Sequence, residues 1–338
     1  MAVPSDMLCA VWRGTGDLRL ERQPVEAPRG DEVLVRVAAC GVCATDLHLL
    51  DGSIALYPPP RILGHETAGV VAAVGPAVRS LRPGDRVALD TSIPCDRCFY
   101  CQEGLPFLCE ERTSRSGGFA EYLAVPERIA YRLPDGVSLE VGALAEPLSC
   151  CLHAVGMAPL RPGATAAVVG AGPIGLLLVQ LLRHLGVVAC VVSEPDPARR
   201  ALARELGATH VVDPRSEDAR TVTLAATDGV GVDAVFEAVG ASATIEAALA
   251  LPRRGGAVVI VGVAPVDATV TLRPWDLFMR ELTIRASTMR ASEFGRAVRL
   301  LPALRLEPLV RERVPLSEVH RAFQLARERR APKVLVCP

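Results

Sequence analysis

A glycine-rich turn at residues 170–175 constrains the fold of this chain more than any other feature. The turn follows the apolar segment Ala166–Val169, and apolar residues recur after it at the i, i+3, i+4 and i+7 spacing of one helix face. A strand, a glycine turn and a helix in this order predict a dinucleotide-binding βαβ unit. The glycines let the backbone approach a pyrophosphate, and the helix amino terminus offers it unpaired N–H groups.

Glu194 and two neighbouring arginines bear on which dinucleotide binds. Glu194 follows a second predicted strand, Val187–Val192, at about 20 residues after the turn. A carboxylate there accepts hydrogen bonds from ribose hydroxyls and repels a 2′-phosphate, so NAD is predicted and NADP is less favoured. Arg199 and Arg200 are the opposing evidence, because guanidinium groups pair with phosphate. The candidate cofactor-binding residues are Gly170, Gly172, Pro173, Ile174, Gly175, Glu194 and Arg199.

Predicted strands and helices alternate along residues 154–289, which indicates an α/β domain with a doubly wound, parallel, six-stranded sheet. The six predicted strands are Ala166–Val169, Val187–Val192, His210–Val212, Ala234–Glu237, Ala257–Val263 and Leu282–Ala286. We expect the last of these strands at an open edge of the sheet. Because an apolar edge invites pairing with a second copy of the chain, the sequence predicts a homo-oligomer.

The flanking residues 1–153 and 290–338 have a different texture, with short β segments that are broken by Gly and Pro. This pattern predicts a β-rich, partly closed domain. The clearest of its segments are Glu32–Ala39, Ala68–Val74 and Arg86–Asp90. Near the C-terminus, Ser292–Leu301 and Leu316–Glu328 are predicted helices. Lys333–Val336 is a predicted final strand that completes the sheet of the first domain.

The stretch Gly41–Glu66 contains a candidate catalytic metal site. It includes Cys43, His65 and Glu66, and zinc takes Cys sulfur, His nitrogen and carboxylate oxygen as ligands. Three protein ligands with a fourth position left to water or substrate are typical of a catalytic zinc ion.

Four cysteines within residues 91–112 form a second, closed candidate site. Cys95, Cys98, Cys101 and Cys109 have the spacing C-x-x-C-x-x-C-x7-C. Four thiolates complete a tetrahedron around one zinc ion without an open position, so this site is predicted to be structural. An iron–sulfur cluster uses the same ligand type. A zinc ribbon that binds nucleic acid is a further alternative, which the neutral charge of the chain argues against.

Composition and charge argue against several other classes of protein. The 338 residues carry a net charge of −1 without a run of like charge, so no nucleic-acid partner is expected. The N-terminus resembles no signal peptide, and the uncharged run Pro162–Leu182 is interrupted by glycines and Pro173, so no membrane segment is expected. Eleven cysteines at metal-ligand spacings or in apolar surroundings fit a reducing cytoplasm. Lys333 is the only lysine, which we interpret as composition bias in an arginine-rich chain.

These motifs together resemble the zinc-containing medium-chain dehydrogenase/reductase (alcohol dehydrogenase) family, and within it the polyol, sorbitol-type branch. The resemblance covers nearly the whole chain. The motifs that carry it are Gly41–His48, Gly64–Glu66, the four cysteines, Glu146–Ser149, Gly170–Gly175 and Lys333–Val336. It implies a GroES-like catalytic domain at residues 1–153 with a zinc lobe at 91–112. A dinucleotide-binding Rossmann domain follows at 154–289, and the catalytic domain resumes at 290–338.

The resemblance also implies the ligands of the catalytic zinc ion. Cys43 and His65 correspond to zinc ligands, and Glu66 or Glu146 supplies a further one, with the choice between the two carboxylates open. Asp46 corresponds to a carboxylate that orients His65, as metal-bound imidazoles usually require.

By the same resemblance, Thr45 takes the substrate proton and His48 ends a relay to solvent, so Thr45, His48 and Glu66 are the candidate catalytic residues. Two departures from the family stand out. Ala44 stands where several relatives carry a basic residue that reaches the cofactor phosphates, and the loop Leu49–Arg61 does not match a substrate loop that we can assign. Arg290 is a candidate for the substrate pocket.

The predicted activity is hydride transfer between NAD and a secondary alcohol of a polyol, sugar or cyclitol, with two zinc ions per chain. Glu146 motivates this substrate class, because a second carboxylate near zinc adds acceptors for neighbouring hydroxyls. An aminocyclitol or other secondary-metabolite alcohol is the alternative substrate, and ketone reduction is the alternative direction. The family resemblance implies a homodimer or homotetramer.

Overall fold

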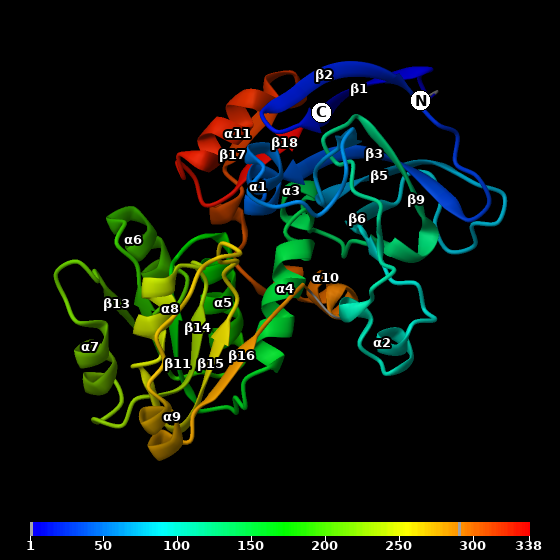
Figure 1. Ribbon diagram of the computed structural model, residues 1–338. Coiled ribbons are helices and arrows are strands. Elements are labelled where there is room, and N and C mark those ends of the chain that lie inside the picture. The colour runs from blue at the N-terminus through cyan, green and yellow to red at the C-terminus, as the bar shows by residue number, and fades with distance from the viewer. Residues whose placement is uncertain (1–2, 290–291) are drawn as a thin grey trace. The chain divides into compact units, whose positions relative to one another are not determined.

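The computed structural model describes residues 3–289 and 292–338 (Figure 1). The chain divides into two compact units, one formed by Met1–Pro147 with Phe294–Pro338 and the other by Leu148–Glu293. Arg290, the candidate pocket residue, lies outside the described residues. Within the described part of the chain, no helix combines the length and apolar character needed to cross a bilayer.

A seven-stranded sheet is the centre of the first unit. Its strand order is β10-β6-β5-β3-β18-β17, and β9 pairs with β3 in addition. The strands are β3 (Glu32–Gly41), β5 (Glu66–Val74), β6 (Arg86–Asp90), β9 (Tyr122–Pro126), β10 (Ala130–Arg132), β17 (Glu312–Pro315) and β18 (Val334–Cys337). β18 pairs with β3, with Leu335 opposite Gly41, so the prediction that the final strand completes this sheet is confirmed.

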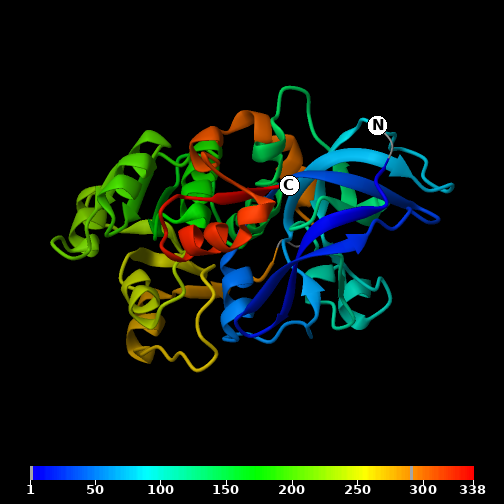
Figure 2. The same ribbon diagram turned by 90° about the horizontal axis from the view of Figure 1, so that it is seen from above.

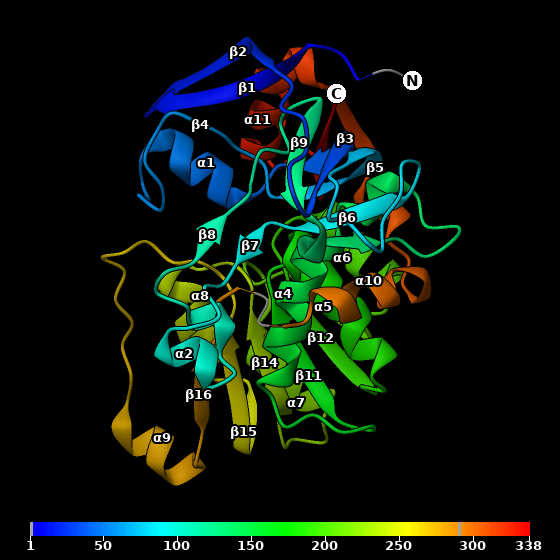
Figure 3. The same ribbon diagram turned by 90° about the vertical axis from the view of Figure 1, so that its right-hand side faces the viewer.

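Two smaller sheets accompany the central one. The first has the order β2-β1-β4 and the second pairs β7 with β8. Their strands are β1 (Asp6–Gly14), β2 (Asp17–Pro24), β4 (Arg61–Ile62), β7 (Ser92–Ile93) and β8 (Thr113–Ser114). Figure 3 shows that β7 and β8 lead into the lobe that contains α2 (Phe99–Gln102).

β3 is buried along most of its length because it contributes to two apolar cores. Val33 and Val35 belong to one core, with residues of β5, β6 and β9. Cys40 belongs to the other core, together with Phe119 and Phe323. β-branched valines suit a strand that is enclosed in this way.

The helices of the first unit are short. The α-helices are α1 (Ala44–Asp51), α2 (Phe99–Gln102), α3 (Leu139–Gly142), α10 (Phe294–Leu300) and α11 (Val319–Arg327). The 3₁₀ helices are Pro106–Leu108, Glu127–Ile129, Leu301–Ala303, Glu307–Leu309 and Leu316–Glu318. The helix predicted over Leu316–Glu328 therefore begins as 3₁₀ and continues as α11, which lies near the strands of the N-terminal segment (Figure 2).

The second unit contains a parallel six-stranded sheet with the order β13-β12-β11-β14-β15-β16. Counted from the first strand of this unit, the order is 3-2-1-4-5-6, which is the dinucleotide-binding arrangement. The strands are β11 (Thr165–Val169), β12 (Ala189–Ser193), β13 (His210–Val212), β14 (Val232–Glu237), β15 (Pro252–Ile260) and β16 (Thr283–Ala286). The predicted fold class is confirmed, and β16 stands at the open edge as expected.

The helices of this unit connect successive strands. They are α5 (Pro173–His184), α6 (Pro197–Glu205), α7 (Ala219–Ala225), α8 (Ser242–Ala248) and α9 (Pro274–Arg280). α4 (Ala145–Gly156) passes from one unit into the other. α5 is buried from Gly175 to Leu182, as its apolar sequence predicts.

One strand of the second unit differs from its predicted bounds by more than two residues. The strand expected over Ala257–Val263 runs from Pro252 to Ile260. It ends early because the backbone amides of Val261 and Gly262 both donate to the Glu237 carbonyl oxygen, at 2.8 and 2.9 Å. The chain therefore turns away from the sheet at this point.

Candidate metal centres and cofactor site

Cys43, His65 and Glu66 form one cluster, in which one potential ligand atom of each lies within 4.8 Å of the others. The register of the sheet brings them together. Gly41 at the end of β3 pairs with Glu66 at the start of β5, so the residues after β3 meet the residues before β5. Cys43 is the N-cap residue of α1, where its backbone N–H is bound by the carboxylate of Asp46 at 2.9 Å.

Asp46 also faces the imidazole of His65. Its Oδ1 lies 3.6 Å from His65 Nδ1, and only 1% of the Asp46 side chain is exposed. Burial alone would lower the pKa of His65, but the charges of Asp46 and Cys43 outweigh it and raise that pKa well above its ordinary value. A buried carboxylate beside an imidazole creates a setting that favours a cation.

Glu66 is buried, and its two carboxylate oxygens differ in their surroundings. Oε1 accepts a hydrogen bond from Lys333 Nζ at 2.6 Å, while Oε2 is buried without a hydrogen-bond partner. A Cβ atom at Gly41 would lie 2.0 Å from Oε2, so only glycine leaves room for this oxygen. Burial raises the pKa of Glu66 despite the opposing charge of Lys333, and the charge of Glu146 adds to the rise.

Glu146 lies in the first turn of α4 and is 7% exposed. It is close enough for its charge to act on Glu66, but it is not part of the three-residue cluster. The structure thus brings together Cys43, His65 and Glu66, with Glu146 as a neighbouring buried carboxylate.

The two candidate relay residues lie on α1, three residues apart and therefore on one helix face. Thr45 Oγ1 lies 3.7 Å from Cys43 Sγ. His48 Nδ1 lies 3.0 Å from the hydroxyl of Ser53, which is exposed. Thr45 is therefore next to the cluster, and His48 leads away from it toward solvent.

The four cysteines of the lobe also converge. The sulfur atoms of Cys95, Cys98, Cys101 and Cys109 all lie within 4.8 Å of one another. The Cys95–Cys101 and Cys98–Cys101 separations are 4.0 and 3.6 Å. A tetrahedron with zinc–sulfur bonds of about 2.3 Å has edges of about 3.8 Å, so the set fits one zinc ion.

Hydrogen bonds in the lobe stabilise negative charge on some of its sulfur atoms, whereas burial raises the pKa of the Cys101 thiol to about 12. The backbone amides of Cys95 and Cys98 donate to the sulfur atoms of Cys109 and Cys95, both at 3.3 Å. A backbone hydrogen bond from Cys101 is the main factor that lowers the pKa of Cys98 to about 7. Thiolates are the form of cysteine that binds metal.

The glycine turn of the second unit has the geometry that a pyrophosphate site requires. Gly170 has a φ of +96°, and a Cβ atom at Gly175 would lie 1.9 Å from the Gly170 carbonyl oxygen. A Cβ atom at Gly172 would meet nothing within 4 Å, so the space above the amino terminus of α5 is open. Pro173 and Ile174 begin that helix.

Glu194 directly follows β12 and is 5% exposed. Its Oε2 accepts from the Ala171 backbone N–H at 2.7 Å, and its Oε1 accepts from the Asp196 backbone N–H at 2.9 Å. Glu194 is therefore fixed beside the glycine turn. Arg199 and Arg200 lie in the first turn of α6, where Arg199 N–H donates to Asp196 and the Arg200 guanidinium donates to backbone carbonyls.

Sequence reasoning missed Lys333 and Asp213. Lys333, interpreted as a sign of composition bias, is buried against Glu66 and the Val42 carbonyl oxygen. The sequence contained part of the information needed to predict this pair. A lysine directly before an apolar strand is hard to bury without an acidic partner. Asp213 directly follows β13 and pairs with two arginines. No local motif marks it.

Comparison with known proteins gives two family matches. Residues 29–135 match the alcohol dehydrogenase GroES-like domain, and residues 173–303 match the zinc-binding dehydrogenase domain. Sorbitol dehydrogenase from Bacillus subtilis is 34% identical to this chain and the match covers 99% of this chain and 98% of the relative. D-arabitol-phosphate dehydrogenase from Enterococcus avium is also 34% identical, over 90% of each chain.

The fold comparison agrees. A zinc-binding dehydrogenase from Sinorhizobium meliloti 1021, whose crystal structure contains NADP, superimposes with a TM-score of 0.92 at 36% identity. That match covers 99% of this chain and all of the other. The fold and the sites define an oxidoreductase class that binds zinc and a nicotinamide cofactor. The chain belongs to the zinc-containing medium-chain alcohol dehydrogenase family, and its relatives include members of the polyol dehydrogenase branch.

Proposed function

We propose that this protein is an NAD-dependent zinc dehydrogenase that oxidises a secondary alcohol of a polyol, sugar or cyclitol to the ketone. The observation that carries the proposal is the Cys43–His65–Glu66 cluster with its unpartnered, buried Glu66 Oε2. A buried carboxylate oxygen without a partner is costly unless it meets a cation. In this proposal the first unit supplies the metal and the proton relay, and the second unit supplies the cofactor site.

The donor set fits a catalytic zinc ion, which Cys43 and His65 would hold with Glu66 or Glu146 as a further ligand. Zinc, when bound, supplies Lewis-acid chemistry that makes an alcohol more acidic. Asp46 fixes the orientation of His65 through Nδ1, which leaves Nε2 for the metal. Cys95, Cys98, Cys101 and Cys109 would hold a second zinc ion with a structural role only.

The residues of α1 account for the proton. Thr45 lies beside Cys43 and offers a hydroxyl that accepts the alcohol proton and passes its own proton on. His48, on the same helix face and next to an exposed serine, receives the proton and releases it to solvent. The nicotinamide supplies the hydride acceptor, and the glycine turn with Glu194 holds the adenosine half of the cofactor.

The preference for NAD over NADP rests on Glu194. Its buried carboxylate lies beside the Ala171 amide and presents acceptors to ribose hydroxyls, and its charge opposes a 2′-phosphate. The Sinorhizobium meliloti structure was solved with NADP, so the nucleotide preference of this chain needs a direct measurement. We expect Glu194→Ala to narrow the ratio of kcat/KM for NAD over NADP, since it removes both the acceptor and the repulsion.

The substrate class rests on the two neighbouring carboxylates. Glu146 adds negative charge and hydrogen-bond acceptors next to Glu66, which suits a substrate with several hydroxyl groups. The sorbitol and D-arabitol-phosphate dehydrogenases among the relatives support the same class. The same carboxylates favour an ammonium group, so an aminocyclitol is the second candidate substrate.

The test is a panel of polyols, cyclitols, aminocyclitols and simple primary alcohols at matched concentrations, with NADH and NADPH formation measured for each. We expect the highest kcat/KM for a secondary alcohol with hydroxylated neighbours, together with two zinc ions per chain by metal analysis. Highest activity on ethanol would overturn the substrate proposal. One zinc ion per native chain would contradict the assignment of two metal sites.

A further inference from the structure

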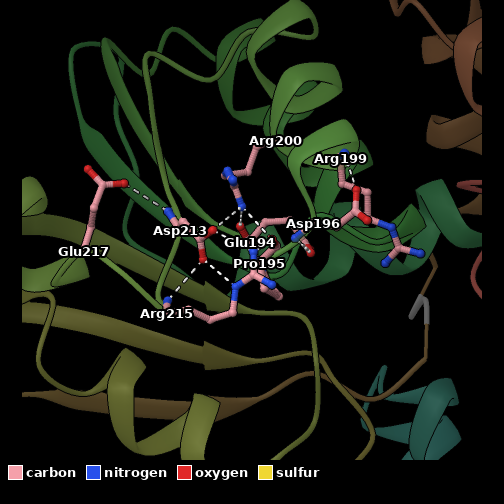
Figure 4. A network of polar contacts seen from close by, with 8 residues as sticks. All are labelled: Glu194, Pro195, Asp196, Arg199, Arg200, Asp213, Arg215 and Glu217. Carbon is pink, nitrogen blue, oxygen red and sulfur yellow. Dashed lines mark hydrogen bonds and ion pairs between the residues drawn. The ribbon is translucent and has the colours of Figure 1, made fainter.

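A network of polar side chains surrounds the residues that follow β12 and β13 (Figure 4). These two parallel strands are neighbours, with Ser193 paired to Val212. Glu194 and Asp213 are the residues immediately after each strand, so they emerge side by side at the same end of the sheet. The Glu194 backbone N–H donates to the Val212 carbonyl oxygen at 3.0 Å, which fixes this juxtaposition.

Two guanidinium groups in this network donate hydrogen bonds to backbone carbonyl oxygens of the Glu194–Pro195 turn. Arg200 Nη1 donates to the carbonyl oxygens of Glu194 and Pro195, both at 2.7 Å. Arg215 Nη2 donates to the same Pro195 carbonyl oxygen at 2.5 Å. Both cations are therefore bound to the turn that carries the proposed ribose acceptor.

Asp213 is the anion that holds both cations. Its carboxylate accepts from Arg215 Nε at 2.9 Å and Arg215 Nη2 at 2.7 Å, which is a two-point contact. Arg200 Nη1 lies 3.2 Å from its Oδ2. The Asp213 and Arg200 side chains are only 17% and 19% exposed, so water screens this pair less than a surface pair.

The position of these arginines matters because guanidinium is the preferred partner of a phosphate group. An arginine near the ribose acceptor is the usual means by which a dinucleotide site accommodates a 2′-phosphate. Here Arg200 and Arg215 are close to that position, but Arg200 Nη1 and Arg215 Nε and Nη2 already face Asp213 and backbone carbonyl oxygens. The Arg199 side chain extends away from Asp213 (Figure 4).

We propose that Asp213 is a positioning residue for cofactor selectivity, which holds Arg200 and Arg215 against the Glu194–Pro195 backbone and so keeps both from pairing with a 2′-phosphate. The inference rests on the proposed NAD preference and names a second determinant of it beside Glu194. The hydrogen bonds from Arg215 lower the pKa of Asp213, so its carboxylate stays ionised at neutral pH.

The test is Asp213→Asn, which keeps the size of the side chain and removes its charge. Dissociation constants are measured by calorimetry for ADP-ribose and for 2′-phospho-ADP-ribose, two fragments without the nicotinamide, so no turnover is needed. We expect the preference for ADP-ribose to fall by about five- to tenfold in the variant, because released guanidinium groups pair with the phosphate. Asp213→Glu retains the charge and should keep a ratio near that of the wild type.

Two further variants separate positioning from general damage. In the Asp213→Asn background, Arg200→Gln with Arg215→Gln should restore the wild-type ratio, since the cations that gained access are gone. Asp233→Asn is the matched control. Asp233 also pairs with an arginine, Arg253, at 2.7 Å, but it lies on the first residues of β14, at the opposite ends of the parallel strands.

The outcomes are distinct. Equal weakening of both ligands by Asp213→Asn, with an unchanged ratio, would overturn the inference. So would a strong loss of 2′-phospho-ADP-ribose binding in Arg215→Gln alone, because it would mean that Arg215 is already free in the native protein. A wild type that prefers 2′-phospho-ADP-ribose would instead overturn the proposed NAD preference, and the change of ratio in Asp213→Asn would still report on Asp213.

Discussion

At the scale of single residues, Glu66 shows how a site is prepared for a cation. One of its oxygens is neutralised by Lys333, and the other is buried, unpartnered and given room by the missing side chain of Gly41. In the proposed zinc site the ammonium and the metal ion would share this carboxylate, with Lys333 on Oε1 and the metal on Oε2. Lys333 supplies the counter-charge of Glu66 when no ion is bound.

This arrangement predicts the effect of Lys333→Met. Removal of the ammonium leaves a buried carboxylate without a counter-charge, which costs about 3–5 kcal/mol of unfolding free energy. We expect that loss in the zinc-depleted protein and a clearly smaller loss in the zinc-loaded protein, where the metal replaces the missing charge. Denaturant unfolding of both forms measures the difference, with Lys333→Arg as the charge-preserving control. Equal losses in both forms would mean that Glu66 does not approach the metal.

At the scale of elements, the cysteine lobe between β7 and β8 has little apolar burial of its own. Phe99, Leu105 and Leu108 are all more than a third exposed, and Cys109 is the one ligand that is buried. A segment of this kind cannot offset the entropy of ordering through burial alone. We therefore propose that metal coordination by the four cysteines orders the lobe, because structural zinc binding is folding free energy.

Substitutions at the two cysteine sites should therefore affect different properties, stability at one site and turnover at the other. Cys98→Ser is expected to increase proteolysis and hydrogen exchange over residues 91–112 and to lower the melting temperature. Cys43→Ser, in the open three-ligand cluster, is expected to abolish turnover while the melting temperature stays close to the wild-type value. If Cys43→Ser destabilised the fold as much as Cys98→Ser, the distinction between catalytic and structural sites would be wrong.

Residues 79–81 form a loop before β6 that is held by one carboxylate, so the stability of this loop depends on pH. Glu127 accepts hydrogen bonds from the backbone amides of Arg79, Ser80 and Leu81 and from the Ser80 hydroxyl. These hydrogen bonds lower the pKa of Glu127 from 4.5 to about 2, and the bond from the Ser80 hydroxyl makes the largest contribution.

Because the folded-state pKa of Glu127 is depressed, its stabilising contribution is fully present above pH 4.5 and is lost as the pH falls toward 2. We expect Glu127→Gln to lower the unfolding free energy at pH 7 and to flatten its decline below pH 4.5. Urea unfolding at a series of pH values is the measurement. A variant with the same slope as the wild type in that range would refute the assignment.

At the scale of the whole molecule, the second unit presents surfaces that favour self-association. β16 is the open edge of the sheet, and the helix before it, α9, exposes Trp275, Phe278 and Met279. Neighbouring exposed aromatics and an unpaired strand edge are typical of an interface. We propose a homo-oligomer in which this region meets its own copy about a two-fold axis.

Phe278→Asp should weaken that association, since it places a charge in the centre of the exposed apolar group. Light scattering over a range of concentrations is expected to show a dimer or tetramer for the wild type and a shift toward monomer for the variant. Phe99→Asp is the matched control, because Phe99 is exposed to a similar degree, 67% against 75%, in the other unit. A monomeric wild type would exclude the proposal.

The sequence by itself determined those features that depend on residues close together in the chain. The glycine turn with its strand and helix, the four-cysteine spacing and the alternation of strands and helices are local patterns. The first and the last predicted their elements, and the cysteine spacing predicted a cluster of thiols that the structure brings together. The final strand was also predictable, because a short apolar segment after a catalytic-domain pattern has few places to pair. The bounds of β15 were not predictable locally, because the strand begins at Pro252 and includes Gly255 and Gly256, residues that weaken strands.

Only the tertiary structure decided the contacts between distant residues. Lys333 reaches Glu66 across 267 positions because β18, β3 and β5 are adjacent in one sheet. Asp213 meets Arg200 because β12 and β13 are parallel neighbours whose ends coincide. Strand register fixes such pairs, and register is set by the packing of the whole sheet. The sequence could therefore name the candidate ligands, while only the fold showed which charged residues surround them.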